Sequence, residues 1–242
     1  MPSDDLLNIQ TAHNSQTRNN WERCKSHREK LTALICDGST KARLRIFGAG
    51  NCNDIDLTQL TTHFTNIELV DIDQAALDHA IDYQKISDKH GVACTSEVDL
   101  SNHDYKTDHL ADVTVSSCLF SQLIEQLPVA ELRNAEFVAE YRRQHLNMLL
   151  ETTTPGGTVL FVSDMVSNLT IPGLGRAKPN QLNGILSHAI EKKNFFTGTN
   201  PFSIEQQLNQ MESVKSHQLH DAWLWKLGAR TFAVYAFSIM NA

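Results

Sequence analysis

Residues 44–54, Leu-Arg-Ile-Phe-Gly-Ala-Gly-Asn-Cys-Asn-Asp, decide the predicted fold. A largely apolar run over residues 44–47 leads into Gly48-Ala49-Gly50, and an amphipathic stretch over residues 54–64 follows. This order predicts a strand, a tight glycine turn and a helix. The glycines let the backbone turn sharply and approach a ligand closely, because neither carries a Cβ. The expected helix would direct its free N–H groups back at the turn. Taken alone, the stretch fits a nucleoside-cofactor cradle and a plain strand-to-helix turn equally well.

A second apolar run, residues 67–70, ends at Asp71. An acidic residue at the tip of a second strand can accept hydrogen bonds from both hydroxyls of a ribose. The third predicted strand, residues 92–100, closes at Asp99. That carboxylate could accept a hydrogen bond from an adenine amino group, or it could simply cap the turn before Ser101.

Helical patterns alternate with these strands and with two further predicted strands, residues 110–115 and 158–162. Such alternation implies a parallel sheet built from βαβ units. Ligands of these sheets bind beyond the carboxyl ends of the strands. Five polar or glycine residues fall at those ends, which predicts one shared site: Gly48, Asp71, Asp99, Ser117 and Asp164. Asp164 is a candidate general base, with an ordinary solvated carboxylate as the alternative, and His103 is expected on the surface.

The two ends of the chain depart from this alternation. We expect residues 1–15 to form a loose tail and residues 18–37 a helix that covers the sheet. Residues 165–202 are rich in proline and glycine and predict an irregular cap. Two final strands, residues 222–227 and 231–239, must pair antiparallel, because a parallel crossover needs a dozen or more residues. The expected organisation is a tail and covering helix over residues 1–40 and a single domain over residues 41–242.

The composition restricts the partners that we expect. The chain of 242 residues has 21 basic and 28 acidic residues, a formal net charge of −7, which disfavours a nucleic-acid partner. A polar start and dispersed cysteines without a CxxC pair predict a cytoplasmic protein with reduced thiols. No apolar run reaches the roughly 18–20 residues of a membrane span. The eleven histidines show no metal-ligand spacing, so no metal is expected.

Taken together, the glycine turn at 47–50, Val70-Asp71-Ile72-Asp73, Asp99 and the closing hairpin resemble the class I S-adenosylmethionine-dependent methyltransferases. The resemblance covers residues 44–240. It implies an α/β fold, a Rossmann-like three-layer sandwich whose mostly parallel seven-stranded sheet ends in an antiparallel hairpin.

The same resemblance implies a cofactor, S-adenosylmethionine, and a place for each part of it. The glycine turn would contact the methionine part. The acid after the second strand would bind the ribose, and the acid after the third strand would lie beside the adenine. The segment after the fourth strand would line the methyl-transfer site. In chain order the implied binding residues are Gly48, Ala49, Gly50, Asn51, Asp71, Ile72, Asp99, Leu100, Ser116 and Ser117.

Two other functions stay open at this point. A nicotinamide-dependent oxidoreductase would need a third glycine in the turn, where this chain has Asn53. A binding module that keeps the cofactor fold without catalysis would have the same sequence pattern. Ser117-Cys118-Leu119-Phe120 stands where methyltransferases that act on bases or glutamine carry an Asn/Asp-Pro-Pro-Tyr motif. We therefore expect a small-molecule acceptor, and we assign neither a catalytic residue nor an oligomeric state.

Overall fold

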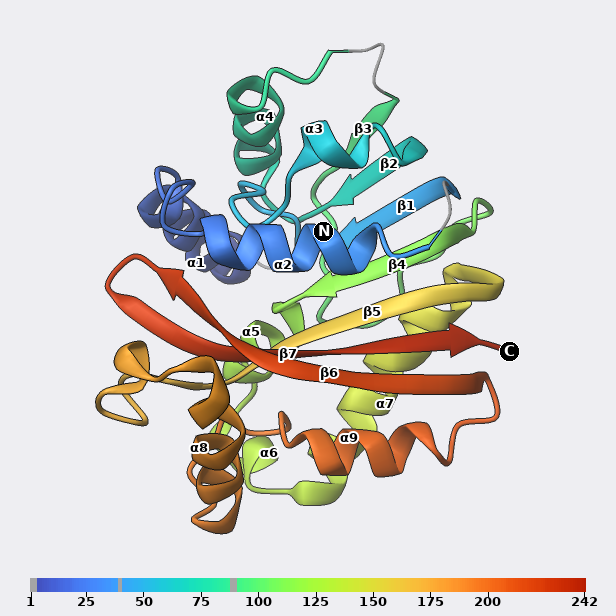
Figure 1. The fold of residues 1–242 in the computed structure, drawn as a ribbon. Coiled ribbons are helices and arrows are strands. Elements are labelled where there is room, and N and C mark those ends of the chain that lie inside the picture. The colour runs from blue at the N-terminus through green and yellow to red at the C-terminus, as the bar shows by residue number, and fades with distance from the viewer. Residues whose placement is uncertain (1–3, 39–40, 88–90) are drawn as a thin grey trace.

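The computed structural model describes residues 4–38, 41–87 and 91–242. The described strands are β1 (Lys41–Phe47), β2 (Phe64–Val70), β3 (Val92–Thr95), β4 (Ala111–Ser117), β5 (Thr153–Ser167), β6 (Val214–Leu227) and β7 (Arg230–Asn241). The α-helices are α1 (Asp4–Thr17), α2 (Lys25–Ile35), α3 (Leu57–Leu60), α4 (Gln74–Tyr83), α5 (Leu119–Glu125), α6 (Val129–Leu132), α7 (Ala135–Glu151), α8 (Pro179–Glu191) and α9 (Pro201–Leu208). A short 3₁₀ helix, η2 (Leu174–Arg176), precedes α8 (Figure 1).

The strands form one seven-stranded sheet in the order β3-β2-β1-β4-β5-β7-β6. Strands β1 to β5 pair in parallel with their neighbours, whereas β7 pairs antiparallel with both β5 and β6. The hairpin between β6 and β7 closes between Leu227 and Arg230. The predicted Rossmann-like sheet with a closing antiparallel hairpin is therefore confirmed.

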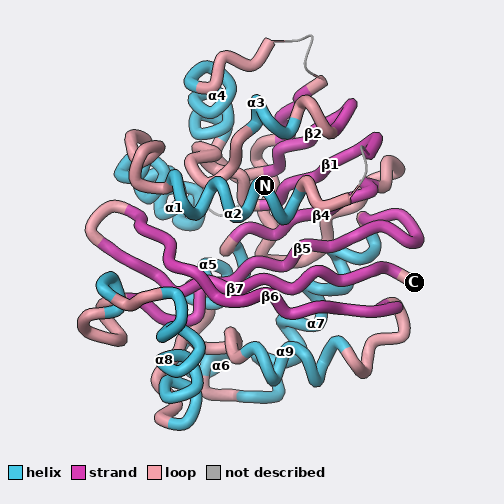
Figure 2. The backbone as a smooth tube through the Cα atoms, viewed as in Figure 1, coloured by secondary structure: helices cyan, strands magenta, loops and turns pink. Residues whose placement is uncertain are grey.

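Alternate residues of the central strands enter two separate cores, as the period of two in a strand requires. In β7, Val234 and Ala236 pack into a core that includes residues of α2 and α4. Tyr235 and Phe237 pack into the opposite core with residues of α5, α7 and α9. Helices accordingly lie on both faces of the sheet, and α2 crosses its front in the view of Figure 1 while α5 and α7 lie behind it (Figure 2). This is the predicted three-layer sandwich.

Several predicted elements differ from the observed ones. The tail expected over residues 1–15 is a helix from Asp4 onward, and residues 1–3 lie outside the described chain. The helix expected over residues 54–64 has four residues, Leu57–Leu60, because β2 already begins at Phe64. The third strand ends at Thr95 and not at residue 100, since the chain turns at Glu97 with a φ of 59°.

The expected cap is more regular than its proline and glycine content suggested. Its first residues continue β5 to Ser167, and Pro179–Glu191 forms a helix, α8. Proline at the first position of α8 starts the helix, because its fixed φ suits that position and no hydrogen bond of its nitrogen is lost. Gly173, with a φ of 89°, turns the chain between these two elements.

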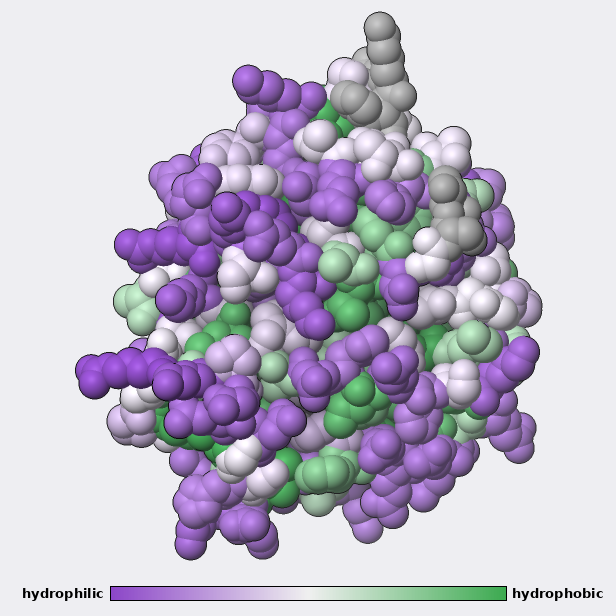
Figure 3. All heavy atoms as spheres, viewed as in Figure 1, coloured by the Kyte–Doolittle hydropathy of each residue, from purple (hydrophilic) through white to green (hydrophobic). Residues whose placement is uncertain are grey.

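Hydrophilic side chains predominate on the face drawn in Figure 3, and hydrophobic ones form small, separate areas between them. Across residues 4–38, 41–87 and 91–242, no helix combines the length and the apolar content that crossing a bilayer would require.

Candidate functional site

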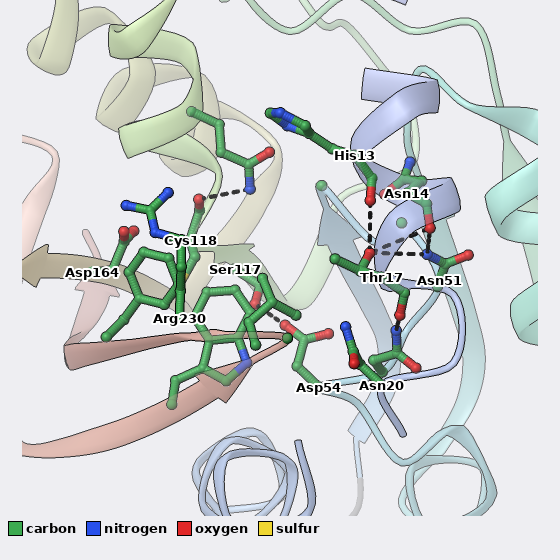
Figure 4. A pocket seen from close by; sticks show the side chains of 18 of the residues that line it. His13, Asn14, Thr17, Asn20, Asn51, Asp54, Ser117, Cys118, Asp164 and Arg230 are labelled. Atoms are coloured by element: carbon green, nitrogen blue, oxygen red, sulfur yellow. Dashed lines mark hydrogen bonds between the residues drawn. The ribbon is translucent and has the colours of Figure 1, made fainter. Parts of the chain in front are cut away.

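A cavity of about 510 Å³ lies at the carboxyl ends of the parallel strands. The glycine turn after β1 forms one wall, the end of β4 contributes Ser117, and β5 contributes Asp164, two residues beyond its last residue paired with β4. The C-terminal half of α1 and the β6–β7 turn, including Arg230, complete the lining (Figure 4). The structure thus brings together, from distant parts of the sequence, three of the five strand-end positions that we expected to share a site.

The glycine turn requires glycine at both of its ends. Gly48 and Gly50 have φ angles of 71° and 49°, in the left-handed region that side chains disfavour. A Cβ on Gly48 would lie 3.1 Å from the Cβ of Leu119. The expected helix does not begin at the turn, because α3 starts only at Leu57, where Asp56 caps it by accepting a hydrogen bond from the Gln59 N–H. The turn itself therefore forms the wall of the cavity without a helix N-terminus behind it.

Helix α1 lies over the glycine turn and is held there by polar contacts. Asn14 donates through Nδ2 to Asp73 Oδ2 at 3.0 Å. In return, the side-chain amide of Asn51 donates to the Asn14 carbonyl at 2.8 Å, and that of Asn53 to the Thr17 carbonyl at 2.8 Å. Carbonyls in the last turn of a helix have no partner within the helix, so these two asparagines cap α1. The sequence did not reveal this helix because its contacts are polar and leave no apolar stripe.

Asp54 is the residue of the site that sequence reasoning missed most clearly. It lines the cavity, and its Oδ2 accepts a 2.7 Å hydrogen bond from Ser117 Oγ. The His27 Nε2 atom lies 3.8 Å from the same oxygen, and the Trp223 indole N–H donates to His27 Nδ1 at 2.8 Å. Because Nδ1 accepts, the proton of a neutral His27 ring sits on Nε2, facing Asp54. Ser117 on β4 thus fixes one oxygen of this carboxylate by a hydrogen bond, and the His27 ring on α2, held by Trp223 on β6, lies beside it.

Asp71 is buried, with 7% of its surface exposed, at the end of β2 and outside the lining of the cavity. Its Oδ2 accepts from the Gly50 N–H at 2.8 Å and its Oδ1 from the Asp73 N–H at 3.0 Å. Burial raises the pKa of Asp71, although these backbone N–H groups oppose the shift. Each carboxylate oxygen accepts one of these two hydrogen bonds, and the Ile72 N–H also interacts with the carboxylate. Ile72 beside it is also buried.

Of the residues predicted to contact the adenine or to line the methyl-transfer site, three have structural contacts and one, Ser117, lines the cavity. Asp99 Oδ1 accepts hydrogen bonds from the Ser101 N–H at 2.9 Å and from Ser101 Oγ at 2.6 Å, which is the capping arrangement considered as the alternative. Leu100 is buried in the core on the α7 side. Ser116 is fully buried and hydrogen-bonds with His145 Nε2 at 2.9 Å. Of the ten residues implied to bind the cofactor, only 48–51 and Ser117 line the cavity.

His103 contradicts the expectation of a surface residue. It is buried, with 8% exposed, and its ring lies edge-on to Tyr141 with 4.4 Å between ring centroids. Burial lowers the pKa of His103 to about 4, so the ring is neutral near pH 7. The sequence placed it in a loop, and the loop packs against α7.

Asp164 is likewise buried, with 6% of its surface exposed, and is not the solvated carboxylate considered as its alternative. Its Oδ1 accepts a short hydrogen bond from Ser121 Oγ on α5. Burial raises the pKa of Asp164 to about 6, while Ser121 opposes the shift. The carboxylate lines the cavity on the side away from α1, next to Arg230 (Figure 4). Within the described residues, no group of three or more His, Cys, Asp or Glu side chains is placed to hold a metal ion.

No protein-family model matches the sequence, and no curated protein matches it. Solved structures do resemble it. The N-methyltransferase NodS from Bradyrhizobium japonicum WM9, in complex with S-adenosyl-L-homocysteine, has a TM-score of 0.58 at 10% identity over 98% of this chain and 99% of that one. YcgJ from Bacillus subtilis has a TM-score of 0.53 at 8% identity over 89% of this chain and 98% of that one. A SAM-dependent methyltransferase from Leishmania major reaches 0.50 at 12% identity over 95% of this chain and 82% of that one. The chain therefore has the fold of the class I S-adenosylmethionine-dependent methyltransferases.

Proposed function

We propose that the chain is an S-adenosylmethionine-dependent methyltransferase that acts on a small-molecule acceptor in the cytoplasm. The observation that carries the proposal is the single cavity in which the Gly48–Gly50 turn and the β4 tip meet two fixed carboxylates, Asp54 and Asp164. The likeness in fold to structures of S-adenosylmethionine-dependent enzymes supports it.

The residues present fit the methionine end of the cofactor. Gly48 and Gly50 of the turn carry no Cβ, so a ligand can approach the backbone closely at these two residues. Asp54 lines the same cavity as this wall, and Ser117 holds one of its two oxygens. The second oxygen can accept a charge-assisted hydrogen bond from the cofactor's ammonium group.

The adenosine end falls to residues beside the cavity. Asp71, at the end of β2, would accept hydrogen bonds from the ribose hydroxyls beside those from the Gly50 and Asp73 N–H groups. Asp99 and Leu100 would flank the adenine ring, as the resemblance implies. Asn14 lies beside both ends: its Nδ2 donates to Asp73, two residues after Asp71, and its Oδ1 lies 3.1 Å from the position of a Cβ built on Gly50. Cofactor binding would therefore require α1 to shift at Asn14.

When bound, S-adenosylmethionine supplies a methyl group on a sulfonium, which is already activated for displacement. The task left to the protein is to hold donor and acceptor in line, and such positioning can contribute roughly 7–11 kcal/mol. Residues from α1, β4, β5 and the β6–β7 turn line the cavity in which donor and acceptor would be held.

A small acceptor suits the dimensions and charge of the site. The cavity of about 510 Å³ lies within the usual range of small-molecule pockets, about 300–1,000 Å³. The net charge of −7 disfavours a long polyanion.

Isothermal titration calorimetry with S-adenosylmethionine, S-adenosylhomocysteine and NAD tests the proposal. We expect both sulfur compounds to bind with one site per chain and NAD to produce no heat of binding. Tighter binding of NAD would instead favour the oxidoreductase. Incubation with methyl-labelled cofactor and a metabolite extract, followed by mass spectrometry, then separates an enzyme from a module that binds the cofactor without turnover.

A further inference from the structure

The part of the cavity around Asp164, away from α1, carries charged groups that restrict which methyl acceptor it can bind. Asp164 lies in β5, two residues beyond the last β5 residue paired with β4, where the pairing of β5 with β7 shifts register between Asp164 and Val166. Its side chain is buried, and Ser121 on α5 holds Oδ1. Among the described residues, no other side chain donates to its second oxygen, Oδ2. Asp164 thus presents a fixed carboxylate with an open acceptor position at the wall of the cavity.

Charged and titratable groups face Asp164 from each element packed around it. Glu125 lies at the exposed rim on α5 and Arg230 at the start of β7, and both line the same cavity. The buried Cys118 thiol and Tyr235 hydroxyl also interact with it, and burial raises the pKa of each. His13 reaches the cavity from α1 on the opposite side (Figure 4). Burial and Glu125 favour the protonated form of Asp164, whereas Arg230 favours the carboxylate.

Arg230 adds an observation that points to a ligand. Its Nε atom is buried and has no hydrogen-bond acceptor among the described residues. The guanidinium lies over the Phe232 ring, with Cζ 4.6 Å from the ring centroid, and a terminal nitrogen reaches Ser167 Oγ at 3.4 Å. Buried polar groups in proteins nearly always have partners, so an unpaired Nε–H at a cavity wall suits an oxygen from a bound molecule. A cation at this place favours a negatively charged oxygen.

We propose that the methyl acceptor is a compact amine that carries a carboxylate, with the amine on Asp164 and the carboxylate on Arg230. The assignment rests on the proposed methyltransferase function and adds the class of acceptor to it. An ammonium group matches the acidic side of the cavity, formed by Asp164 and Glu125, and a carboxylate matches the unpaired donor of Arg230. An alcohol or a thiol carries no positive charge at neutral pH, so it would match Asp164 and Glu125 less well than an ammonium group does.

The proton balance gives Asp164 a catalytic task. An ammonium nitrogen has no lone pair, so it must lose a proton before it can attack. The Asp164 carboxylate accepts that proton at Oδ2 and becomes a neutral acid. The nitrogen lone pair then forms the new N–C bond to the methyl carbon while the C–S bond breaks and its electron pair stays on sulfur. The products are a methylated ammonium and a neutral thioether.

A matched panel of acceptors tests the assignment with methyl-labelled S-adenosylmethionine. It comprises amino acids, the amines that lack their carboxylate, N-acetylated amino acids and the corresponding hydroxy acids. We expect label in the amino acids, at least about tenfold less in the amines without a carboxylate, and none in the acetylated and hydroxy compounds. Transfer to hydroxy acids, or to amines regardless of a carboxylate, would overturn the assignment.

Two variants test the roles of the residues. Asp164→Asn should lower kcat/KM by about 100-fold or more and abolish the rise of the rate with pH near 6, with S-adenosylhomocysteine affinity unchanged. Arg230→Gln should raise KM for the amino acid by about tenfold and leave KM for the amine without a carboxylate unchanged. Asp82→Asn on the exposed side of α4 is the matched control and should behave as the unmodified chain does. Thermal unfolding checks that each variant is folded. If Asp164→Asn does not fold, the KM values of Arg230→Gln test the acceptor assignment.

The controls separate two kinds of failure. If the unmodified chain binds neither S-adenosylmethionine nor S-adenosylhomocysteine, the proposed function itself is refuted, and the acceptor assignment with it. A second outcome is that the cofactor binds, but Asp164→Asn weakens only the binding of S-adenosylmethionine and leaves the pH profile unchanged. Asp164 then interacts with the positive charge of the sulfonium and not with the acceptor. The acceptor assignment alone is then wrong.

Discussion

Ser117 Oγ donates a 2.7 Å hydrogen bond to Asp54 Oδ2, which connects the tip of β4 to the segment after the glycine turn. Both residues line the cavity, and they are 63 positions apart in the chain. The bond fixes one oxygen of the carboxylate and so orients the other. Under the proposed function, this second oxygen holds the ammonium group of the cofactor.

Replacement of Asp54 by asparagine should weaken the binding of S-adenosylmethionine and S-adenosylhomocysteine alike. Both carry the ammonium group, and a hydrogen bond between charged groups contributes about 1.5–3 kcal/mol, which corresponds to about 10- to 150-fold in affinity. Calorimetry on Asp54→Asn and on the surface control Asp82→Asn measures the effect. Methylthioadenosine, which lacks the amino-acid part, should bind equally to both variants. An equal loss for methylthioadenosine would mean that Asp54 contacts another part of the cofactor or acts only on the fold.

Replacement of Asn14 by alanine should loosen α1 without unfolding the protein. The change removes the hydrogen bond to Asp73 and the amide oxygen that lies over Gly50. Helix α1 has no fully buried side chain over residues 6–17, so few apolar contacts would compensate locally. Hydrogen exchange followed by mass spectrometry should show faster exchange in α1 and little change in the sheet. Bound S-adenosylhomocysteine should also dissociate faster.

The control for this variant is Asn8→Ala, at an exposed position on the same helix. Alanine favours a helix more than asparagine does, so this change should leave exchange in α1 unchanged or slower. Equal acceleration in both variants would show that the Asn14 contacts do not hold the helix in place.

The parts of the fold that apolar periodicity determines were predictable from the sequence. Strands β1 and β2 and the hairpin of β6 and β7 have side chains that pack on the sheet, so their pattern shows in the sequence. The third strand was predicted too long because Val98 and Leu100 continue its alternation. The backbone nevertheless leaves the sheet at Glu97, which has a positive φ. Glutamate is not a residue that favours a positive φ, so the sequence did not indicate this turn.

The site was predictable where it depends on strand ends and not where it depends on polar contacts. Gly48, Gly50 and Ser117 follow from the rule that strand ends meet at one edge of a parallel sheet. Asp164 lies just beyond the parallel part of β5, although β5 itself continues to Ser167. The burial of Asp164 depends on Ser121, 43 residues earlier in the chain, and that contact leaves no local pattern. Asp54 was read as the start of an amphipathic helix, so its carboxylate was not considered.

Acid should weaken the fold through Glu68, whose carboxylate pairs with Arg45 in the middle of β1. Arg45 is fully buried, and its Nη2 lies 2.8 Å from Glu68 Oε2. Burial alone would raise the pKa of Glu68, but hydrogen bonds from Tyr105 and the Arg45 charge outweigh it and lower the pKa. A carboxyl group whose pKa is lower in the folded state stabilises the folded protein at pH values above its pKa in the unfolded chain, near 4.3. This stabilisation disappears as the pH falls through the pKa of the folded state.

Glu68→Gln should therefore destabilise the protein by about 3 kcal/mol at pH 7, since it leaves a buried cation without its carboxylate. The difference from the unmodified chain should shrink as the pH falls below about 4. Urea unfolding at several pH values, followed by tryptophan fluorescence, measures both. Glu191→Gln, in an exposed pair with His188, should change stability by less than about 0.5 kcal/mol. A difference that stays constant down to pH 3 would mean that the charge of Glu68 is not what stabilises Arg45.

Two glycines outside the cavity should respond to alanine in opposite directions. Gly91 precedes β3 with a φ of 64°, and a Cβ there would lie 2.2 Å from the Thr65 carbonyl oxygen. Because that oxygen belongs to the backbone of β2, it cannot move aside, and Gly91→Ala should cost at least about 2 kcal/mol. Gly184 lies exposed within α8 with no atom within 4 Å of its Cβ position, so Gly184→Ala should stabilise by about 0.5–1 kcal/mol. Chemical denaturation measures both changes, and binding of S-adenosylhomocysteine should be the same in the folded state of each. A neutral Gly91→Ala would show that the approach of β2 to β3 is looser than this contact requires.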